Sequence, residues 1–338
     1  MKALLYSHPA CLLHDSGLGH PERPDRIGAA LAGVRASGLE VSEREAPPAP
    51  VEVLYPIHQP EYVEHIEAAC ASGGRLLDPD TAVVAGSWEA ALRAAGSGLA
   101  AIDDLRRGDG DMAFLAVRPP GHHAGPSAAR GFCVFNNIAI SAAALVAEGD
   151  RVAILDWDVH HGDGTQQAFY DSADVLYLSA HQFPFYPGSG WIEETGQGAG
   201  SGMTVNVALP AGSAGDTLAD AVDEIFEPVL RDFAPDWVLV SAGYDGHRAD
   251  PLAELRFESD DFGWMAERLV SGYRGRSIVF LEGGYDLGAI SESSSTTVRG
   301  IGGEVFPRPD GASSAPAHEM VQRARQVTSR HWSNVQGG

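Results

Sequence analysis

Basic residues are scarce in this sequence. The 338 residues include 23 Lys+Arg against 46 Asp+Glu, which gives a formal net charge of -23 at pH 7. Lys2 is the only lysine, so the other basic residues are arginines. A protein this negative repels the phosphates of DNA, RNA and anionic lipids. The charge balance therefore argues against nucleic acid as a direct partner and against binding to a membrane surface.

Cysteine and long apolar runs are also scarce. Cys11, Cys70 and Cys133 are odd in number and widely spaced, so we expect neither a disulfide framework nor a Cys-x-x-Cys metal pair. No run approaches the roughly 18 apolar residues of a membrane span. The N-terminal stretch turns polar too early for a signal peptide. We therefore expect a soluble, cytoplasmic protein.

Short apolar runs alternate with longer helical patterns along the chain. The expected strands are residues 3–7, 113–117, 152–156, 175–179, 237–241 and 278–282. Most of these runs are continuous rather than alternating, which is typical of strands buried on both faces of a parallel sheet. The expected helices are residues 60–72, 88–106, 136–148, 217–232 and 260–272. Strands separated by helices predict an α/β fold with one doubly covered sheet.

The chain shows no internal repeat and no second core. Hydrophobic residues make up 44% of it, which is enough for one large core. Residues 302–316 have the composition of a linker, and a last helix is expected at about 317–330. We predict a single domain over residues 1–338 that includes this linker and helix.

Aspartates and a histidine alternate at the end of one strand run. In an extended stretch, alternate residues point the same way, so Asp156, Asp158 and His160 share one face. Asp245 follows another strand run and is the best candidate for a third metal ligand. Two carboxylates, a histidine and water form an open catalytic site that suits Zn²⁺, Fe²⁺ or Co²⁺. The alternative is a helix N-terminus capped by Asp163, with His160 an ordinary buried histidine.

Two adjacent histidines, His122 and His123, follow a Pro-Pro-Gly turn. A histidine that acts as a general base needs a partner that orients it and fixes its tautomer. Asp156 and Asp163 remain free once the metal ligands are assigned, which suggests two His–Asp pairs with different charges and tasks. The alternatives are a surface histidine pair, and carboxylates engaged in helix capping or ordinary ion pairs.

A Glu-Gly-Gly-Tyr sequence follows the last strand run. Its glycines let the backbone approach closely and turn sharply. Tyr285 then offers an O–H donor for a developing oxyanion. The alternative is a tyrosine that packs beside the end of the strand.

Together these motifs resemble the zinc-dependent histone deacetylase superfamily, which includes bacterial class II-like histone-deacetylase-like amidohydrolases, acetylpolyamine amidohydrolases and acetoin-utilisation proteins. The resemblance extends over about residues 12–300. It implies a bacterial enzyme with an arginase-like α/β fold, in which a central parallel sheet of about eight strands has helices on both faces. The matching segments are HPERPDRI (20–27), RPPGHHA (118–124), GFCVFNNIAI (131–140), ILDWDVHHGDGTQ (154–166), SAGYDGHRADPL (241–252) and LEGGYDLG (281–288).

The resemblance implies several groups of site residues. The zinc ligands would be Asp158, His160 and Asp245. The catalytic residues would be His122, His123 and Tyr285, with Asp156 oriented toward the first histidine and Asp163 toward the second. The substrate tunnel would be lined by Gly131, Phe132, Tyr186, Leu252 and Gly283. A structural K⁺ would be bound by Asp156, Asp158, His160, Ser179 and Ala180, largely through backbone carbonyls, and Arg26 would line the acetate-release channel.

The expected reaction is hydrolysis of an N-acyl amine to a free amine and acetate. His123 is the expected base, and His122 gives electrostatic support or acts as the acid. Leu252 stands where polyamine-selective relatives carry an acidic gatekeeper, which favours a small-molecule or peptide substrate of the acyl-lysine kind. The net charge of -23 would still attract acetylpolyamines at long range.

Two other functions fit parts of the pattern. One is a ureohydrolase of the same fold, which would need a second metal ion. The other is a catalytically silent module that recognises acyl groups. The resemblance is also compatible with a homo-oligomer.

Overall fold

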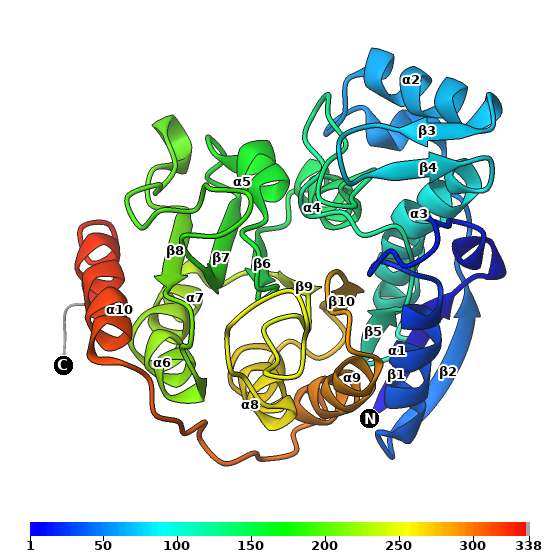
Figure 1. Ribbon diagram of the computed structural model, residues 1–338. Coiled ribbons are helices and arrows are strands. Elements are labelled where there is room, and N and C mark those ends of the chain that lie inside the picture. The colour runs from blue at the N-terminus through cyan, green and yellow to red at the C-terminus, as the bar shows by residue number, and fades with distance from the viewer. Residues whose placement is uncertain (336–338) are drawn as a thin grey trace.

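The computed structural model describes residues 1–335 and contains one eight-stranded sheet (Figure 1). Its strands are all parallel, in the spatial order β2-β1-β5-β10-β9-β6-β7-β8. The predicted α/β fold with a central parallel sheet is therefore confirmed. The strands are β1 (Lys2–Ser7), β2 (Glu40–Glu45), β5 (Met112–Leu115), β6 (Val152–Asp156), β7 (Val175–Gln182), β8 (Thr204–Leu209), β9 (Trp237–Ala242) and β10 (Ser277–Leu281). A separate antiparallel hairpin consists of β3 (Gly74–Leu76) and β4 (Ala82–Val84).

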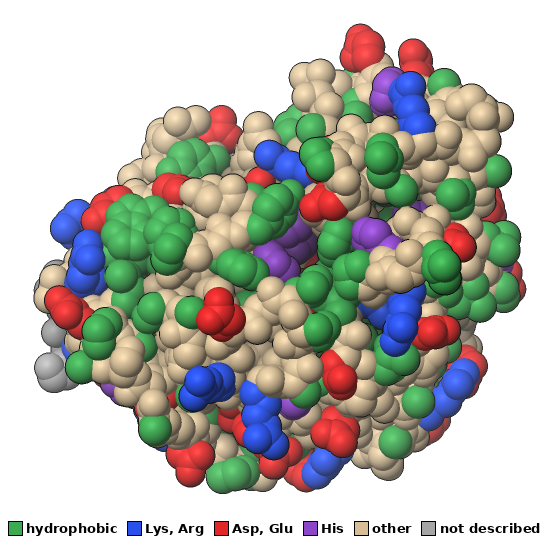
Figure 2. Space-filling view, in the orientation of Figure 1, with side chains coloured by type: hydrophobic (Ala, Val, Ile, Leu, Met, Phe, Trp, Pro, Cys, Tyr) green, Lys and Arg blue, Asp and Glu red, His purple; other side chains and the backbone are tan. Residues whose placement is uncertain are grey.

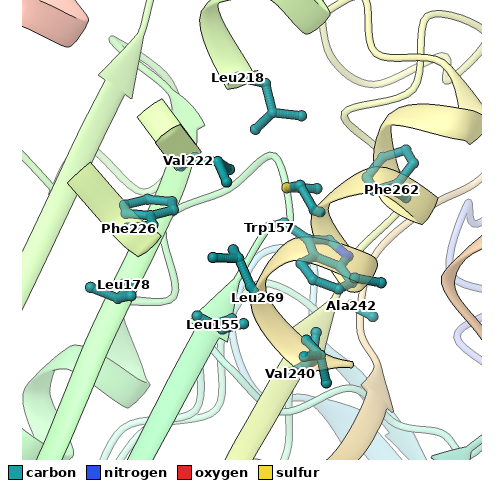
Figure 3. Close-up of a cluster of buried hydrophobic side chains, with 14 of the residues drawn as sticks. Leu155, Trp157, Leu178, Leu218, Val222, Phe226, Val240, Ala242, Phe262 and Leu269 are labelled. Carbon is teal, nitrogen blue, oxygen red and sulfur yellow. The ribbon is translucent and has the colours of Figure 1, made fainter. Parts of the chain in front are cut away.

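Both faces of the sheet are buried because successive side chains of a strand point to opposite sides. In β1, Leu5 belongs to one core, whereas Leu4 and Tyr6 belong to the other. Figure 3 shows part of the first core, where Trp157 packs among aliphatic and aromatic side chains. The helices of the first face are α1 (Asp25–Ala36), α6 (Gly215–Ala221), α7 (Glu227–Phe233), α8 (Ser259–Val270), α9 (Leu287–Ile301) and α10 (Ala315–Thr328). Those of the second are α2 (Pro60–Ala71), α3 (Ser87–Arg106), α4 (Asn137–Ala147) and α5 (Asp163–Phe169).

The six predicted strands and the five predicted internal helices are present, but some elements were not predicted. The strand β2 has the sequence EVSERE and lies at the edge of the sheet, where its charged side chains reach solvent. In β8, Thr204 and Asn206 interrupt the apolar run. The helix α9 is rich in serine and threonine, which are weak helix formers, and it is stabilised by packing against α1 and α8. The short α5 and the N-terminal α1 were also not predicted.

The C-terminal segment returns to the far edge of the sheet. After α9 the chain passes below α8 and α6 as an extended segment, which agrees with the predicted linker at 302–316 (Figure 1). The last helix, α10, begins two residues before the predicted start and packs on β8 and α6. It covers β8, the edge strand. The predicted domain ends at residue 338, and its last three residues lie outside those that the structure describes.

None of the helices within residues 1–335 combines the length and the apolar character that crossing a bilayer requires.

Candidate active site and metal centre

Five neighbouring strands supply the site from their carboxyl ends. In spatial order these strands are β5, β10, β9, β6 and β7. Ligands of open parallel sheets bind beyond this edge, because the loops that follow the strands converge there. Figure 2 shows histidine side chains in a hollow on this face, among hydrophobic groups. Apart from Arg26 on α1, the residues singled out in the sequence lie at the ends of these five strands or follow them, so the sheet gathers them from distant parts of the chain.

Two carboxylates and one imidazole converge after β6 and β9. Each of Asp158, His160 and Asp245 offers one atom to a set in which all lie within 4.8 Å of one another. Nδ1 of His160 is 3.0 Å from Oδ1 of Asp158 and 3.2 Å from Oδ2 of Asp245. That Asp245 oxygen is buried, and among the described residues it has no hydrogen bond of acceptable geometry.

Glycines make room for these carboxylates. A Cβ at Gly243 would lie 2.0 Å from Oδ2 of Asp158, and one at Gly283 would lie 2.1 Å from Oδ2 of Asp245. Burial lowers the pKa of His160, but its contacts with Asp158 and Asp245 outweigh this effect and raise the pKa to about 10. The negative field that favours a proton there equally favours a divalent cation. The donor set and its unsatisfied oxygen therefore fit a metal ion such as Zn²⁺.

The adjacent histidines each face a carboxylate. Nδ1 of His122 is 3.1 Å from Oδ2 of Asp156, and Nδ1 of His123 is 2.8 Å from Oδ1 of Asp163. The two imidazole rings are 4.0 Å apart between centroids. The structure thus brings together the two His–Asp pairs that the sequence suggested.

The two pairs differ in charge. Burial disfavours a charged His122, but the negative charges of Asp158 and Asp156 outweigh this and raise its pKa well above the usual range. Burial also lowers the pKa of His123, and the positive charges of His122 and His160 lower it further. The carboxylates therefore favour the protonated form of His122, whereas burial and the neighbouring histidines favour the neutral form of His123.

Tyr285 lies in the loop that follows β10. Its backbone N–H donates to Oδ2 of Asp250 at 2.6 Å, and Gly284 makes the turn before it with a φ of 106°. Its ring stands edge-on to Phe132, with 5.9 Å between centroids. Burial and the negative charge of Asp245 raise the pKa of Tyr285 well above its usual value. The phenol therefore stays protonated and able to donate at neutral pH.

A narrow cavity of about 220 Å³ leads to these groups. The five residues predicted for the substrate tunnel, including Tyr186, all line it. The lining consists of Asp80, Pro120, His122, His123, Gly131, Phe132, Cys133, His160, Tyr186, Leu252, Gly283 and Tyr285. Most of the wall is aromatic or apolar, which suits an unbranched aliphatic chain.

The remaining predicted residues lie around this centre. Arg26 is fully buried, with its guanidinium 5.1 Å from the centroid of the Tyr285 ring, and its Nε donates to Gly284 O at 2.6 Å. Ser179 pairs with Asp156 in the β6–β7 register, and Ala180 follows it in β7. The residues predicted to bind K⁺ are therefore neighbours in the fold.

Three residues were missed in the sequence. Tyr177 donates its hydroxyl to Oδ2 of Asp156 at 3.0 Å, and Nη2 of Arg130 lies 3.1 Å from Oδ2 of Asp163. Glu282 accepts hydrogen bonds from the backbone of the histidine loop. Only Glu282 gave a signal, since a carboxylate directly after an apolar strand is unusual.

Comparison with known proteins identifies a family and several relatives. The histone deacetylase domain model matches residues 20–301. A probable deacetylase of Archaeoglobus fulgidus is 39% identical, and the aligned region covers 96% of this chain and 97% of that protein. A histone deacetylase-like amidohydrolase of Pseudomonas aeruginosa is 40% identical, over 79% of this chain and 73% of the relative. The crystal structure of the HDA15 HD domain matches with a TM-score of 0.91 at 32% identity, over 99% of this chain and 96% of that one.

Proposed function

This chain belongs to the histone deacetylase domain family, and we propose that it is a metal-dependent amidohydrolase that removes acetyl groups from amines of the acyl-lysine kind. The observation that carries the proposal is one constellation. A three-residue metal set, two His–Asp pairs and a protonated tyrosine meet at the end of one narrow cavity. Each of these parts has a task in the hydrolysis of an unactivated amide.

The metal ion, Zn²⁺ by family resemblance with Fe²⁺ or Co²⁺ as alternatives, would be held by Asp158, His160 and Asp245. When bound, it supplies Lewis acidity, which polarises a carbonyl and lowers the pKa of water toward about 7. The other functions of the site belong to side chains of the chain itself.

His123 is the general base in this proposal. Its Nδ1–H donates to Asp163, which leaves the lone pair of Nε2 free to accept a proton from the attacking water. Its lowered pKa keeps the ring neutral before the reaction. Asp163 fixes this tautomer and stabilises the imidazolium that forms.

His122 and Tyr285 stabilise charge. The cationic His122, held by Asp156, places a positive charge beside the reacting amide. The phenol of Tyr285 donates a hydrogen bond to the oxyanion that develops as the carbonyl is attacked. The amine then leaves with a proton from one of the histidines.

The cavity determines the substrate class. The side chains of Phe132 and Tyr186 and the exposed Leu252 present apolar surface along an aliphatic chain. Leu252 provides no carboxylate for a second ammonium group, so we propose a preference for acyl-lysine over acetylpolyamines. Arg26, which lies beside the ring of Tyr285, is proposed to line the channel through which acetate leaves. A K⁺ ion near Asp156 and Ser179 is proposed to stabilise the ends of β6 and β7.

The deciding measurement is kcat/KM of metal-loaded protein on an acetyl-lysine peptide and on an acetylpolyamine. A clear preference for the peptide is expected. A preference for the polyamine would show that the negative field of the protein, rather than Leu252, sets specificity. Activity on neither substrate, with one metal ion bound per chain, would overturn the assigned substrate class.

A further inference from the structure

Glu282 is a buried carboxylate to which the proposed reaction gives no task. It is the first residue after β10 and has no solvent exposure. Its Oε2 accepts hydrogen bonds from the backbone N–H of Gly121 at 2.7 Å and of His122 at 3.2 Å. Its Oε1 lies 3.4 Å from the hydroxyl of Ser241, at the end of β9. One side chain thus connects the loops that follow β5 and β10 with the end of β9.

The same short segment also contacts the other parts of the site. The N–H of Gly283, the next residue, donates to Oδ2 of Asp158 at 2.7 Å, and Tyr285 follows two residues later. The carbonyl of Glu282 accepts a hydrogen bond from Arg26. Glu282 therefore links the histidine loop to the segment that contains Tyr285 and contacts Asp158.

This carboxylate is expensive to bury. The buried Arg26 and Arg118 pair with Glu22 instead. Within residues 1–335 no ion pair joins Glu282 to an arginine or a histidine, although a nitrogen of His122 lies within 4.8 Å of it. A carboxylate buried outside a close ion pair loses its hydration, and this costs free energy. Core packing alone does not account for a glutamate here.

Other contacts also hold the histidine loop, such as the hydrogen bond from the N–H of Thr165 to the carbonyl of His122, but the N–H groups of Gly121 and His122 both donate to Glu282. A Cβ at Gly121 would lie 2.6 Å from the backbone N of Asn137 and 2.7 Å from the carbonyl O of Phe135, so protein fills the space on that side. Both Gly121 and His122 are buried. Without Glu282, two buried N–H groups would lose their acceptor, and such groups are costly to leave unpaired.

We propose that Glu282 is a positioning residue that holds the two catalytic histidines in register with Tyr285 by accepting the backbone N–H groups of Gly121 and His122. This inference rests on the proposed function. The effect is geometric: the carboxylate contacts the loop rather than the substrate. A displacement of about 1 Å in a catalytic group can lower a rate by about 10²-fold.

Three substitutions test this role. Glu282→Met removes the acceptor and keeps a similar volume, Glu282→Ala removes the acceptor and the volume, and Glu282→Gln keeps an oxygen acceptor while its amide can donate to Ser241. For both Met and Ala we expect kcat to fall by about 10²-fold with KM within about 3-fold of wild type. For Gln we expect kcat within about 5-fold of wild type. One metal ion per chain should remain bound in all three.

Asp261 offers a matched control. It is a buried carboxylate that accepts a backbone N–H, that of Glu258 at 2.9 Å, in the capping box of α8. Asp261→Asn and Asp261→Ala should lower the melting temperature and leave kcat unchanged. The comparison separates the loss of a buried acceptor from the loss of catalytic geometry.

Two outcomes would overturn the inference alone. One is wild-type kcat in Glu282→Met or Glu282→Ala. The other is loss of the metal in step with loss of activity, which would make Glu282 a support of the metal ligands. A wild-type protein that binds metal but turns over no N-acyl amine would instead overturn the proposed function, and the inference with it.

Discussion

Two groups of carboxylates in this protein have opposite surroundings. The rim group, at the carboxyl ends of the strands, is Asp156, Asp158, Asp163, Asp245 and Glu282. The outer group, on α6 and the helical turns after it, is Asp216, Asp220, Asp223, Glu224 and Glu227. Rim carboxylates are buried or nearly so and contact histidines and backbone N–H groups, with one arginine contact, from Arg130 to Asp163. Outer carboxylates contact arginines and a histidine that are partly exposed.

This difference in burial determines whether a carboxylate affects the neighbouring catalytic groups or only the stability of the fold. A buried carboxylate without an arginine partner strongly perturbs the histidines beside it, because little water screens its charge. An exposed ion pair gains little, since water and salt screen it. Substitutions in the rim group should therefore change kcat more than the free energy of unfolding. Substitutions in the outer group should change both only slightly.

The largest effect is expected at His123. Replacing His123 by Ala removes the proposed base, and kcat should fall by about 10²–10⁴-fold. Single-turnover kinetics on an acetyl-lysine peptide would measure the loss. The melting temperature should stay close to that of the wild type. Activity within about 3-fold of wild type would assign the proton transfer to another group.

Tyr285→Phe should have the next largest effect. It removes one oxyanion donor and leaves the ring contact with Phe132, so kcat should fall by about 10²–10³-fold. Binding of a substrate analogue, measured by calorimetry, should change little. A protein that merely recognises acyl groups would lose nothing, so unchanged behaviour together with an inactive wild type would favour a binding module.

A buried histidine away from the metal set predicts how stability depends on pH. His58 faces the carbonyl of Gly125 through Nδ1 and accepts the N–H of Asn136 at Nε2, and burial lowers its pKa to about 4. The pKa is lower in the folded than in the unfolded state. The stabilisation is therefore complete above about pH 6.5 and is lost as pH falls toward 4, by up to about 3 kcal/mol.

Urea unfolding at pH 7.5 and pH 5 would measure this loss. In His58→Gln, an amide can make the same two hydrogen bonds but does not titrate, so the variant should lose less stability over this interval than the wild type does. Equal losses in the two proteins would show that His58 is not the group that titrates.

The smallest effect is expected in the outer group. Arg308 is half-exposed and pairs with Asp220 at 2.7 Å and Asp223 at 2.9 Å. Arg308→Ala should reduce stability by less than about 1 kcal/mol, and less still in high salt, without changing kcat. A loss of stability several times larger would show that the ion pairs of the outer group contribute substantially to folding.

Most residues of the candidate site could be identified from the sequence, because alternation and strand ends are local properties. Alternation placed Asp156, Asp158 and His160 together, and the ends of apolar runs identified Asp245 and Tyr285. Gly131 and Tyr186 came only from the resemblance, because their loops have no regular period. The role of Glu282 could not be predicted, since its partners depend on which strands are neighbours.

The elements of the fold likewise differ in how far local sequence patterns predict them. Six buried strands were predicted from their apolar runs, whereas the buried β8 was missed because Thr204 and Asn206 interrupt its run. The edge strand β2 was missed because its side chains are mostly charged, and α9 because packing against α1 and α8 overrides the weak helix propensity of its serines and threonines.

The strand order has a consequence for how the protein is made. The last strand in the sequence, β10, occupies a central place between β5 and β9 (Figure 1). Gly121 and Glu282, which meet across this junction, are 161 residues apart. During synthesis, β5 and β9 each have one edge without its partner strand until β10 leaves the ribosome. A chain shortened before residue 277 would lack both the strand that joins the two halves of the sheet and the tyrosine wall, so a premature product would have neither a complete core nor a complete site.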